Sequence, residues 1–178
     1  MKLTLVRHTA VDCLPTLCYG QTDVDVAKSF QDEAEIVRLQ LHSMQFDKVF
    51  SSPLQRCVKL AAYCGFENIQ LDNRLMELNF GDWEGQKWDE ISDPNLEKWY
   101  ADWILMSTTN GESFTDQIHR VEQFLQELST AKWKNVLIFT HAGVIRCFAI
   151  LLGLVDLEKA FSHYSVKYGE IKEFELLQ

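Results

Sequence analysis

Two short apolar runs dominate the hydrophobic pattern of the chain, and each is followed by a histidine. The first is Leu3–Val6, which leads into Arg7 and His8, and the second lies within Asn135–Thr140, which leads into His141. Short apolar runs are typical of strands that are buried on both faces of a parallel sheet. We therefore expect two central strands whose carboxyl ends carry these basic side chains.

Longer stretches with an apolar residue at every third or fourth position predict helices, because this spacing places those residues on one helical face. Ser52 is expected to cap one of these helices, with Pro53 in its first helical position. The segment Ser113–Asp116 has the pattern of a capping box. The five expected helices cover residues 27–44, 53–64, 93–105, 113–128 and 142–152.

The remaining patterned segments predict further strands. These are Lys48–Ser51, Ile69–Leu71 and a closing antiparallel pair, Phe161–Val166 and Glu170–Leu176. Strands that alternate with helices favour an α/β fold, a three-layer sandwich in which helices cover both faces of a mostly parallel central sheet. Because no repeat, linker or low-complexity segment interrupts the pattern, residues 1–178 are expected to form a single domain.

Composition and charge narrow the class of partner. The 178 residues are 47% hydrophobic and 24% charged, and the formal net charge is −9. This charge argues against nucleic acid or an anionic membrane as a partner, and it requires local basic residues wherever an anion binds. The sequence predicts no secretory signal, no membrane span and no particular oligomeric state. Its five cysteines lack zinc-type spacing and indicate reduced thiols, so we expect a cytoplasmic protein.

The basic residues at the expected strand ends predict an anion pocket. Ligands of open α/β sheets bind beyond the carboxyl ends of the strands. Arg7, His8 and His141 follow two of these strands, and Arg56 follows a third through the turn Ser51–Pro53. A guanidinium group is planar and permanently charged, and it binds two phosphate oxygens at once. Phosphate is therefore the expected ligand.

Cleavage of a phosphate ester requires more than an anion pocket. A nucleophile or an activated water must attack phosphorus, and an acid must protonate the leaving oxygen. No cluster of carboxylates or histidines has the spacing of metal ligands, so we expect no metal or other cofactor, and His8 is the candidate nucleophile. The loop 74–85 offers Glu77, Asp82 and Glu84 as proton donors, and physical chemistry alone does not choose among them.

Four motifs, in order along nearly the whole chain, resemble those of the histidine phosphatase (phosphoglycerate mutase-like) superfamily. They are Arg7-His8-Thr9, Ser51-Ser52-Pro53-Leu54-Gln55-Arg56, Arg74-Leu75-Met76-Glu77 with Gly81-Asp82-Trp83-Glu84-Gly85, and His141-Ala142-Gly143-Val144-Ile145-Arg146. The resemblance implies a phosphoglycerate mutase-like fold and a phosphohistidine intermediate at His8. It implies that Arg7, Arg56 and His141 hold the phosphoryl group. It also selects Glu77 as the proton donor.

Two details favour one group within that superfamily. Thr9 stands where many members have glycine, and Cys18–Val24 is similar to the α-ribazole phosphatases of cobalamin assembly. This resemblance implies a metal-independent hydrolase of a small-molecule phosphate ester, α-ribazole 5′-phosphate. Gln21 and Thr22 are candidates for hydrogen bonds to the phosphoryl group, unless they form a simple turn. The alternatives are a broad-specificity sugar phosphatase, a mutase, or a non-catalytic member that binds phosphorylated ligands.

Other residues near these motifs have a structural and a functional interpretation. The tryptophans around Glu77 are expected mainly to pack in the core, and stacking on a flat substrate group is the alternative. Arg146 is expected to support the fold, and the turn Gly111–Ser113 either lines the pocket or only caps a helix. The tryptophans concerned are Trp83, Trp88, Trp99 and Trp103.

Overall fold

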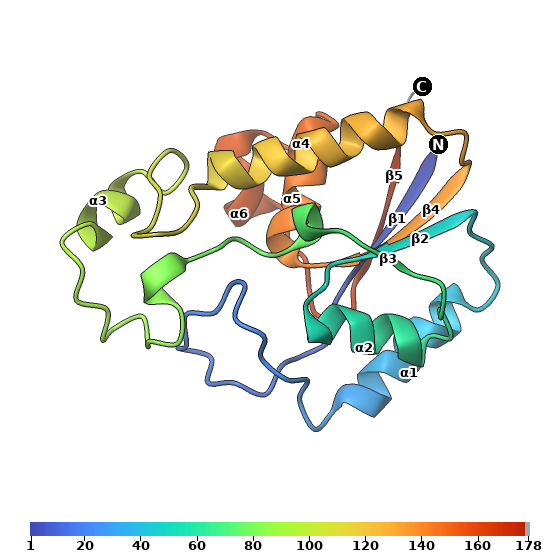
Figure 1. Cartoon of the computed structure of the whole chain (residues 1–178), viewed down its shortest axis with the longest axis horizontal. Coiled ribbons are helices and arrows are strands. Elements are labelled where there is room, and N and C mark those ends of the chain that lie inside the picture. The colour runs from blue at the N-terminus through green and yellow to red at the C-terminus, as the bar shows by residue number, and fades with distance from the viewer. Residues whose placement is uncertain (177–178) are drawn as a thin grey trace.

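A five-stranded sheet with helices on both faces organises the protein in the computed structural model, which describes residues 1–176 (Figure 1). The strand order is β3-β2-β4-β1-β5. Strands β1 to β4 run parallel, and β5 pairs antiparallel with β1 at one edge. The strands are β1 Lys2–Arg7, β2 Lys48–Ser51, β3 Gln70–Leu71, β4 Asn135–Thr140 and β5 Ile171–Glu175. The expected α/β sandwich with a mostly parallel sheet is confirmed.

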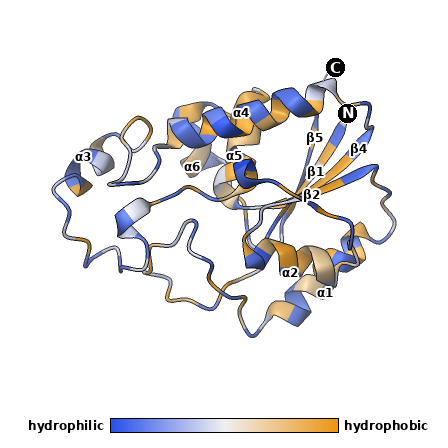
Figure 2. Ribbon diagram, in the orientation of Figure 1, coloured by the Kyte–Doolittle hydropathy of each residue, from blue (hydrophilic) through white to orange (hydrophobic). Residues whose placement is uncertain are grey.

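Two apolar cores fill the spaces between the sheet and its helices. Alternate residues of one strand enter different cores, so that Leu3 and Leu5 pack with α4 and α5, whereas Val6 packs with α1 and α2. In Figure 2 the strands are mostly hydrophobic, and α4 alternates between hydrophobic and hydrophilic stretches, as an amphipathic helix does. The helices are α1 Phe30–Leu41, α2 Gln55–Tyr63, α3 Leu96–Ala101, α4 Phe114–Thr130, α5 Ala142–Leu151 and α6 Ala160–His163.

The helix starts differ from the sequence prediction at three places. Helix α2 begins at Gln55, after the extended residue Leu54, and not at Pro53. The Ser52 hydroxyl contacts His141, and the backbone N–H of Gln55 donates to Asp23, which lies in a distant loop. Helices α1 and α3 are also shorter than expected. The capping box of α4 is confirmed, because Ser113 and Asp116 each bond to the other's backbone N–H.

The predicted strand Phe161–Val166 is wrong. Residues 160–163 form the short helix α6, and β5 pairs with β1 and not with this segment. The apolar residue that suggested a strand, Phe161, packs against Trp103 and Phe114. Tertiary contacts therefore explain its hydrophobicity without a sheet.

Between residues 1 and 176, no helix has the length and apolar character that crossing a membrane requires.

Candidate active site

A cavity of about 260 Å³ lies beyond the carboxyl ends of β1, β2 and β4. Its wall joins residues that are far apart in the sequence, as the parallel sheet predicts. The wall combines polar and charged groups with apolar and aromatic side chains. The polar and charged groups of the wall are Arg7, His8, Arg56, Glu77, Gln117 and Arg146.

His8 is held in the tautomer that a nucleophile requires. Its Nδ1 lies 2.7 Å from the carbonyl oxygen of Thr9, and because a carbonyl only accepts, Nδ1 carries the proton. The lone pair of the ring is therefore on Nε2. Burial, together with the charges of Arg56 and Arg7, places the pKa of His8 well below its ordinary value. The imidazole is thus neutral, and its free nitrogen is available to attack an electrophile.

Arg7 and Arg56 are held by backbone carbonyls. Arg56 is fully buried, and its Nη atoms donate to the carbonyls of Gly20 at 2.6 Å and Thr22 at 3.0 Å. Arg7 donates from Nη1 to the carbonyl of Val166 at 2.6 Å. In the described part of the chain, neither guanidinium forms a salt bridge with a carboxylate. Both positive charges therefore remain available to an anionic ligand.

His141 lies behind His8 and does not itself line the cavity. The two ring centroids are 5.1 Å apart, and the His141 side chain is fully buried. Arg56 Nε donates to His141 Nδ1 at 3.3 Å, which leaves the ring proton on Nε2, 2.8 Å from the Ser52 hydroxyl. Burial and the charge of Arg56 lower the pKa of His141 well below its ordinary value. The second histidine therefore fixes Arg56 and lies against His8, and a direct contact of His141 with the phosphoryl group stays a prediction.

The buried neutral histidines predict a loss of stability in acid. In the unfolded chain each histidine regains a pKa of about 6.5, so below that pH the unfolded state binds protons that the folded state does not. Between about pH 7 and about pH 5.5 the free energy of unfolding should fall by about 1 kcal/mol for each of the two. Urea unfolding of the wild type and of His8→Asn at both pH values measures this. The variant should lose about 1 kcal/mol less, and an equal loss would contradict the buried neutral state of His8.

Glu77 enters the cavity from the loop after β3 and accepts three N–H groups. Leu78 N and Gln117 Nε2 donate to Oε1, each at 3.0 Å, and Gly143 N donates to Oε2 at 3.2 Å. The other two candidate proton donors point elsewhere. Asp82 accepts from the side-chain amide of Asn110, and Glu84 accepts N–H groups of the loop 21–22. Of the three candidates, Glu77 is the one in the cavity wall.

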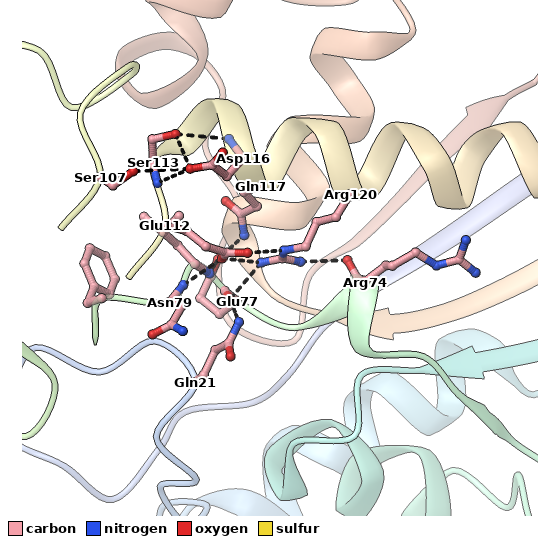
Figure 3. A network of polar contacts seen from close by, with 12 residues as sticks. Gln21, Arg74, Glu77, Asn79, Ser107, Glu112, Ser113, Asp116, Gln117 and Arg120 are labelled. Carbon is pink, nitrogen blue, oxygen red and sulfur yellow. Dashed lines mark hydrogen bonds and ion pairs between the residues drawn. The ribbon is translucent and has the colours of Figure 1, made fainter. Parts of the chain in front are cut away.

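The Glu77 loop is fixed by an arginine that the sequence reasoning missed. Arg120, on α4, donates to the carbonyls of Glu77 at 2.9 Å and of Arg74 at 2.7 Å, and it pairs with Glu112 (Figure 3). Glu112 in turn accepts the backbone N–H of Asn79 at 3.0 Å. The turn Gly111–Ser113 thus braces the loop from behind in addition to capping α4, and it does not line the cavity.

The Glu77 carboxylate occupies space that is open only because residue 143 is a glycine. A Cβ atom at position 143 would lie 2.2 Å from Glu77 Oε1 and 2.9 Å from Gln117 Oε1. Gly143→Ala should therefore displace the carboxylate and lower kcat/KM by about 10- to 100-fold, because small misplacements of reacting groups are costly. Steady-state kinetics with thermal unfolding as a companion measurement checks this. Unchanged kcat/KM in a folded variant would show that the position of Glu77 is unimportant.

Gln21 and Thr22 are occupied by contacts within the protein. The Gln21 amide donates to the carbonyl of Glu77 at 3.1 Å, and the Thr22 hydroxyl donates to Glu84. Their N–H groups also bond to Glu84, and hydrogen bonds of this kind outweigh the opposing effect of burial and lower the pKa of Glu84. Neither side chain lines the cavity, so a direct contact with substrate stays a prediction.

The tryptophans divide as the sequence suggested. Trp83 is buried and donates to Asp93, Trp99 packs on it, and Trp103 packs against Phe114. Trp88 alone of the four lines the cavity. Arg146 donates to the carbonyl of Tyr164 and lies over Phe161, but it also lines the cavity, which the sequence did not predict.

Residues 1–176 contain no group of three or more histidine, cysteine, aspartate or glutamate side chains arranged to hold a metal ion.

Comparison with known proteins connects this site to one family. A family model described as the histidine phosphatase superfamily (branch 1) matches residues 3–176. The adenosylcobalamin/alpha-ribazole phosphatase of Escherichia coli (strain K12) is 29% identical over 178 residues, which cover 95% of this chain and 87% of the relative. Phosphoserine phosphatase 1 of Hydrogenobacter thermophilus is 29% identical over 172 residues, 91% of this chain and 81% of its own. The crystal structure of the alpha-ribazole phosphatase from Shigella flexneri has a TM-score of 0.91 at 27% identity and covers 100% of this chain and 92% of that one.

Proposed function

The chain belongs to the histidine phosphatase superfamily (branch 1) and is a phosphatase, and we propose that it hydrolyses α-ribazole 5′-phosphate through a phosphohistidine at His8. The observation that carries the mechanism is the hydrogen bond from His8 Nδ1 to the carbonyl of Thr9, which leaves Nε2 as a free lone pair beside Arg7, Arg56 and Glu77. The reaction requires a nucleophile, an anion-binding site and a proton donor, and this cavity wall contains candidate residues for each.

The first half-reaction transfers the phosphoryl group to His8. Nε2 forms a bond to phosphorus while the bond to the ester oxygen breaks, and the departing oxygen takes the proton of the Glu77 carboxyl group. Arg7 and Arg56 bind the equatorial oxygens, where negative charge is concentrated. His141 acts behind them by holding Arg56. Because neither arginine forms a salt bridge with a carboxylate among residues 1–176, their positive charge is available to the phosphoryl group.

The second half-reaction regenerates the histidine. Glu77, now a carboxylate, removes a proton from a water that attacks phosphorus, and the bond from phosphorus to Nε2 breaks. Phosphate leaves, His8 returns to its neutral form, and Glu77 is again protonated. The cycle requires no metal, so activity is expected to persist in EDTA.

The cavity wall supports the proposed leaving group. Its apolar and aromatic lining consists of Leu17, Tyr19, Phe80, Trp88 and Phe161, of which Tyr19 lies against Arg56 and Phe161 against Arg146. The benzimidazole of α-ribazole is flat and apolar, and aromatic side chains bind such rings by stacking. The names of the Escherichia coli and Shigella flexneri relatives agree with this substrate. Phosphoserine, named for an equally similar relative, has no ring to fill this space.

A panel of phosphate esters tests the substrate. In buffer with EDTA, kcat/KM should be highest for α-ribazole 5′-phosphate and lower for phosphoserine, 3-phosphoglycerate and a sugar phosphate. A higher kcat/KM for phosphoserine would overturn the proposed substrate and leave the phosphatase assignment intact.

A substitution in the aromatic lining is tested with the same panel of esters. Trp88→Ala should lower kcat/KM for α-ribazole 5′-phosphate by about tenfold, the effect of a lost stacking contact, and leave that for small esters nearly unchanged. An equal loss of kcat/KM for all esters in Trp88→Ala would contradict a stacking role of Trp88.

The cysteines support a cytoplasmic location, which we include in the proposal. All five are free thiols, and Cys18, Cys57 and Cys147 are buried. Unpaired cysteines are typical of a reducing compartment.

A further inference from the structure

Each phosphoryl-binding arginine lies over a tyrosine, and the two tyrosines are hydrogen-bonded to each other. The guanidinium carbon of Arg7 is 3.8 Å from the ring centroid of Tyr168, and that of Arg56 is 5.6 Å from the centroid of Tyr19. The hydroxyl oxygens of Tyr19 and Tyr168 are 2.9 Å apart. Two segments 149 residues apart in the sequence thus meet beside the cavity.

Arg7 has few other contacts that fix its orientation. Its Nη1 bonds to the carbonyl of Val166, and its buried Nε has no hydrogen-bond partner among the described residues. With one hydrogen bond a guanidinium remains free to turn about that bond, and the face of Tyr168 restricts this rotation by stacking. The Tyr168 ring also lies 5.6 Å from the ring of His8. Tyr168 therefore contacts both the cation and the nucleophile.

The tyrosine pair is a poor candidate for a purely structural role. Tyr168 is 42% exposed, and a hydrogen bond at the surface contributes little to the stability of a fold. Burial and the hydrogen bond with Tyr168 raise the pKa of the Tyr19 hydroxyl, which favours its protonated, hydrogen-bonding form. The pair is placed where it sets the positions of two charged groups.

We propose that Tyr19 and Tyr168 are positioning residues that, through their hydrogen bond, hold Arg7 and Arg56 at the separation that a phosphoryl group requires. This inference rests on the proposed phosphoryl-binding role of the two arginines. It adds to the active site the turn before β5, which contains Tyr168. The tyrosines act through the arginines and take no part in proton transfer.

The test is a double-mutant cycle with Tyr19→Phe, Tyr168→Phe and the double variant. Each substitution removes the same hydrogen bond and keeps the ring, so the double variant should lose no more than either single one. We expect the dissociation constant of orthovanadate, measured by calorimetry, to rise by about 3- to 10-fold in all three. Tyr168→Ala also removes the stacking on Arg7 and should raise the dissociation constant of orthovanadate by a further factor of about five. The midpoint of thermal unfolding should stay unchanged in the Phe variants.

The control is Tyr100→Phe, which changes an exposed tyrosine that packs on Trp99 away from the cavity and should leave vanadate binding unaltered. Additive losses in the double variant, or unchanged vanadate affinity in every variant, would overturn the proposal. Turnover of p-nitrophenyl phosphate by the wild type is measured in parallel. A wild type that binds vanadate without turnover would refute the proposed hydrolysis, and the vanadate cycle would still decide on the tyrosine pair.

Discussion

Replacing His8 with alanine is expected to lower turnover by on the order of 10⁴-fold or more, the usual size of the loss of a covalent nucleophile. The reason is geometric as well as chemical. His8 Nε2 is the free ring nitrogen of a neutral imidazole, directed by the bond from Nδ1 to Thr9. His141, the nearest other imidazole, is fully buried and has both ring nitrogens engaged by Arg56 and Ser52. It cannot replace the missing nucleophile.

A direct measurement of the intermediate accompanies the kinetics. Rapid mixing with substrate and an alkaline quench should yield a phosphorylated wild-type chain, stable in base and labile in acid, and no such species for His8→Ala. The matched control is His119→Ala, since His119 is an exposed residue of α4 whose partner is Glu122. Turnover of His8→Ala close to that of the wild type would refute the covalent mechanism. A phosphorylated His8→Ala chain would place the intermediate on another residue.

The central strands were the part of the fold that the sequence predicted best. Strands β2 and β4 have the bounds that the pattern indicated, because their residues are apolar on both faces and contact both cores. The predicted start of α2 was wrong because Leu54 is extended: Ser52 accepts the N–H of Leu54, and Asp23, 32 positions before Gln55, accepts the N–H of Gln55. The predicted strand at 161–166 was wrong because the apolar side chain of Phe161 packs against Trp103 and its segment does not pair in a sheet. Errors therefore occurred where tertiary contacts override local preference.

The active site also contains residues that the sequence could predict and residues whose positions depend on tertiary contacts. The rule that parallel strands end at one edge brought Arg7, His8, Arg56 and His141 together from the sequence alone. It did not choose between Glu77, Asp82 and Glu84, and the structure contains the reason. The position of the Glu77 carboxylate depends on Gln117, Arg120 and Gly143, which lie on α4 and α5 and contact the loop only in the folded chain.

An acidic protein can bind an anion in this cavity because, among the described residues, no carboxylate forms a salt bridge with Arg7 or Arg56. The chain has a net charge of −9, yet the Arg7 and Arg56 guanidiniums are bound by carbonyl oxygens of Gly20, Thr22 and Val166. A carbonyl dipole orients a guanidinium without neutralising it, whereas a carboxylate would compete with the substrate. The protein thus concentrates uncompensated positive charge at one place, and low dielectric around the buried groups strengthens its attraction for phosphate.

Glu77→Gln is expected to lower kcat by about 10²- to 10⁴-fold on an alkyl phosphate ester, the usual contribution of general acid catalysis. An amide has nearly the shape of the carboxyl group, but it neither donates a proton to the leaving oxygen nor accepts one from water. The three N–H groups that surround Glu77 leave the side chain little freedom to move away. The amide oxygen of glutamine can keep the bonds from Leu78 and Gln117, whereas its NH2 group cannot accept the N–H of Gly143, so thermal unfolding of the variant is measured beside the kinetics.

The leaving group separates this role from simple binding. With p-nitrophenyl phosphate the leaving group is the p-nitrophenolate ion, which departs without protonation. The first half-reaction of Glu77→Gln should therefore be nearly normal on this ester, whereas hydrolysis of the phosphohistidine should remain slow. Rapid-mixing kinetics should then show a burst of p-nitrophenol followed by a slow steady state, with phosphorylated enzyme accumulating. A loss of equal size on both esters, with no burst, would mean that Glu77 only binds the substrate. The burst distinguishes the two roles of Glu77. Loss of a residue that only binds substrate slows formation of the phosphohistidine. Loss of a residue that acts first as acid and then as base slows breakdown of the phosphohistidine when the leaving group needs no proton.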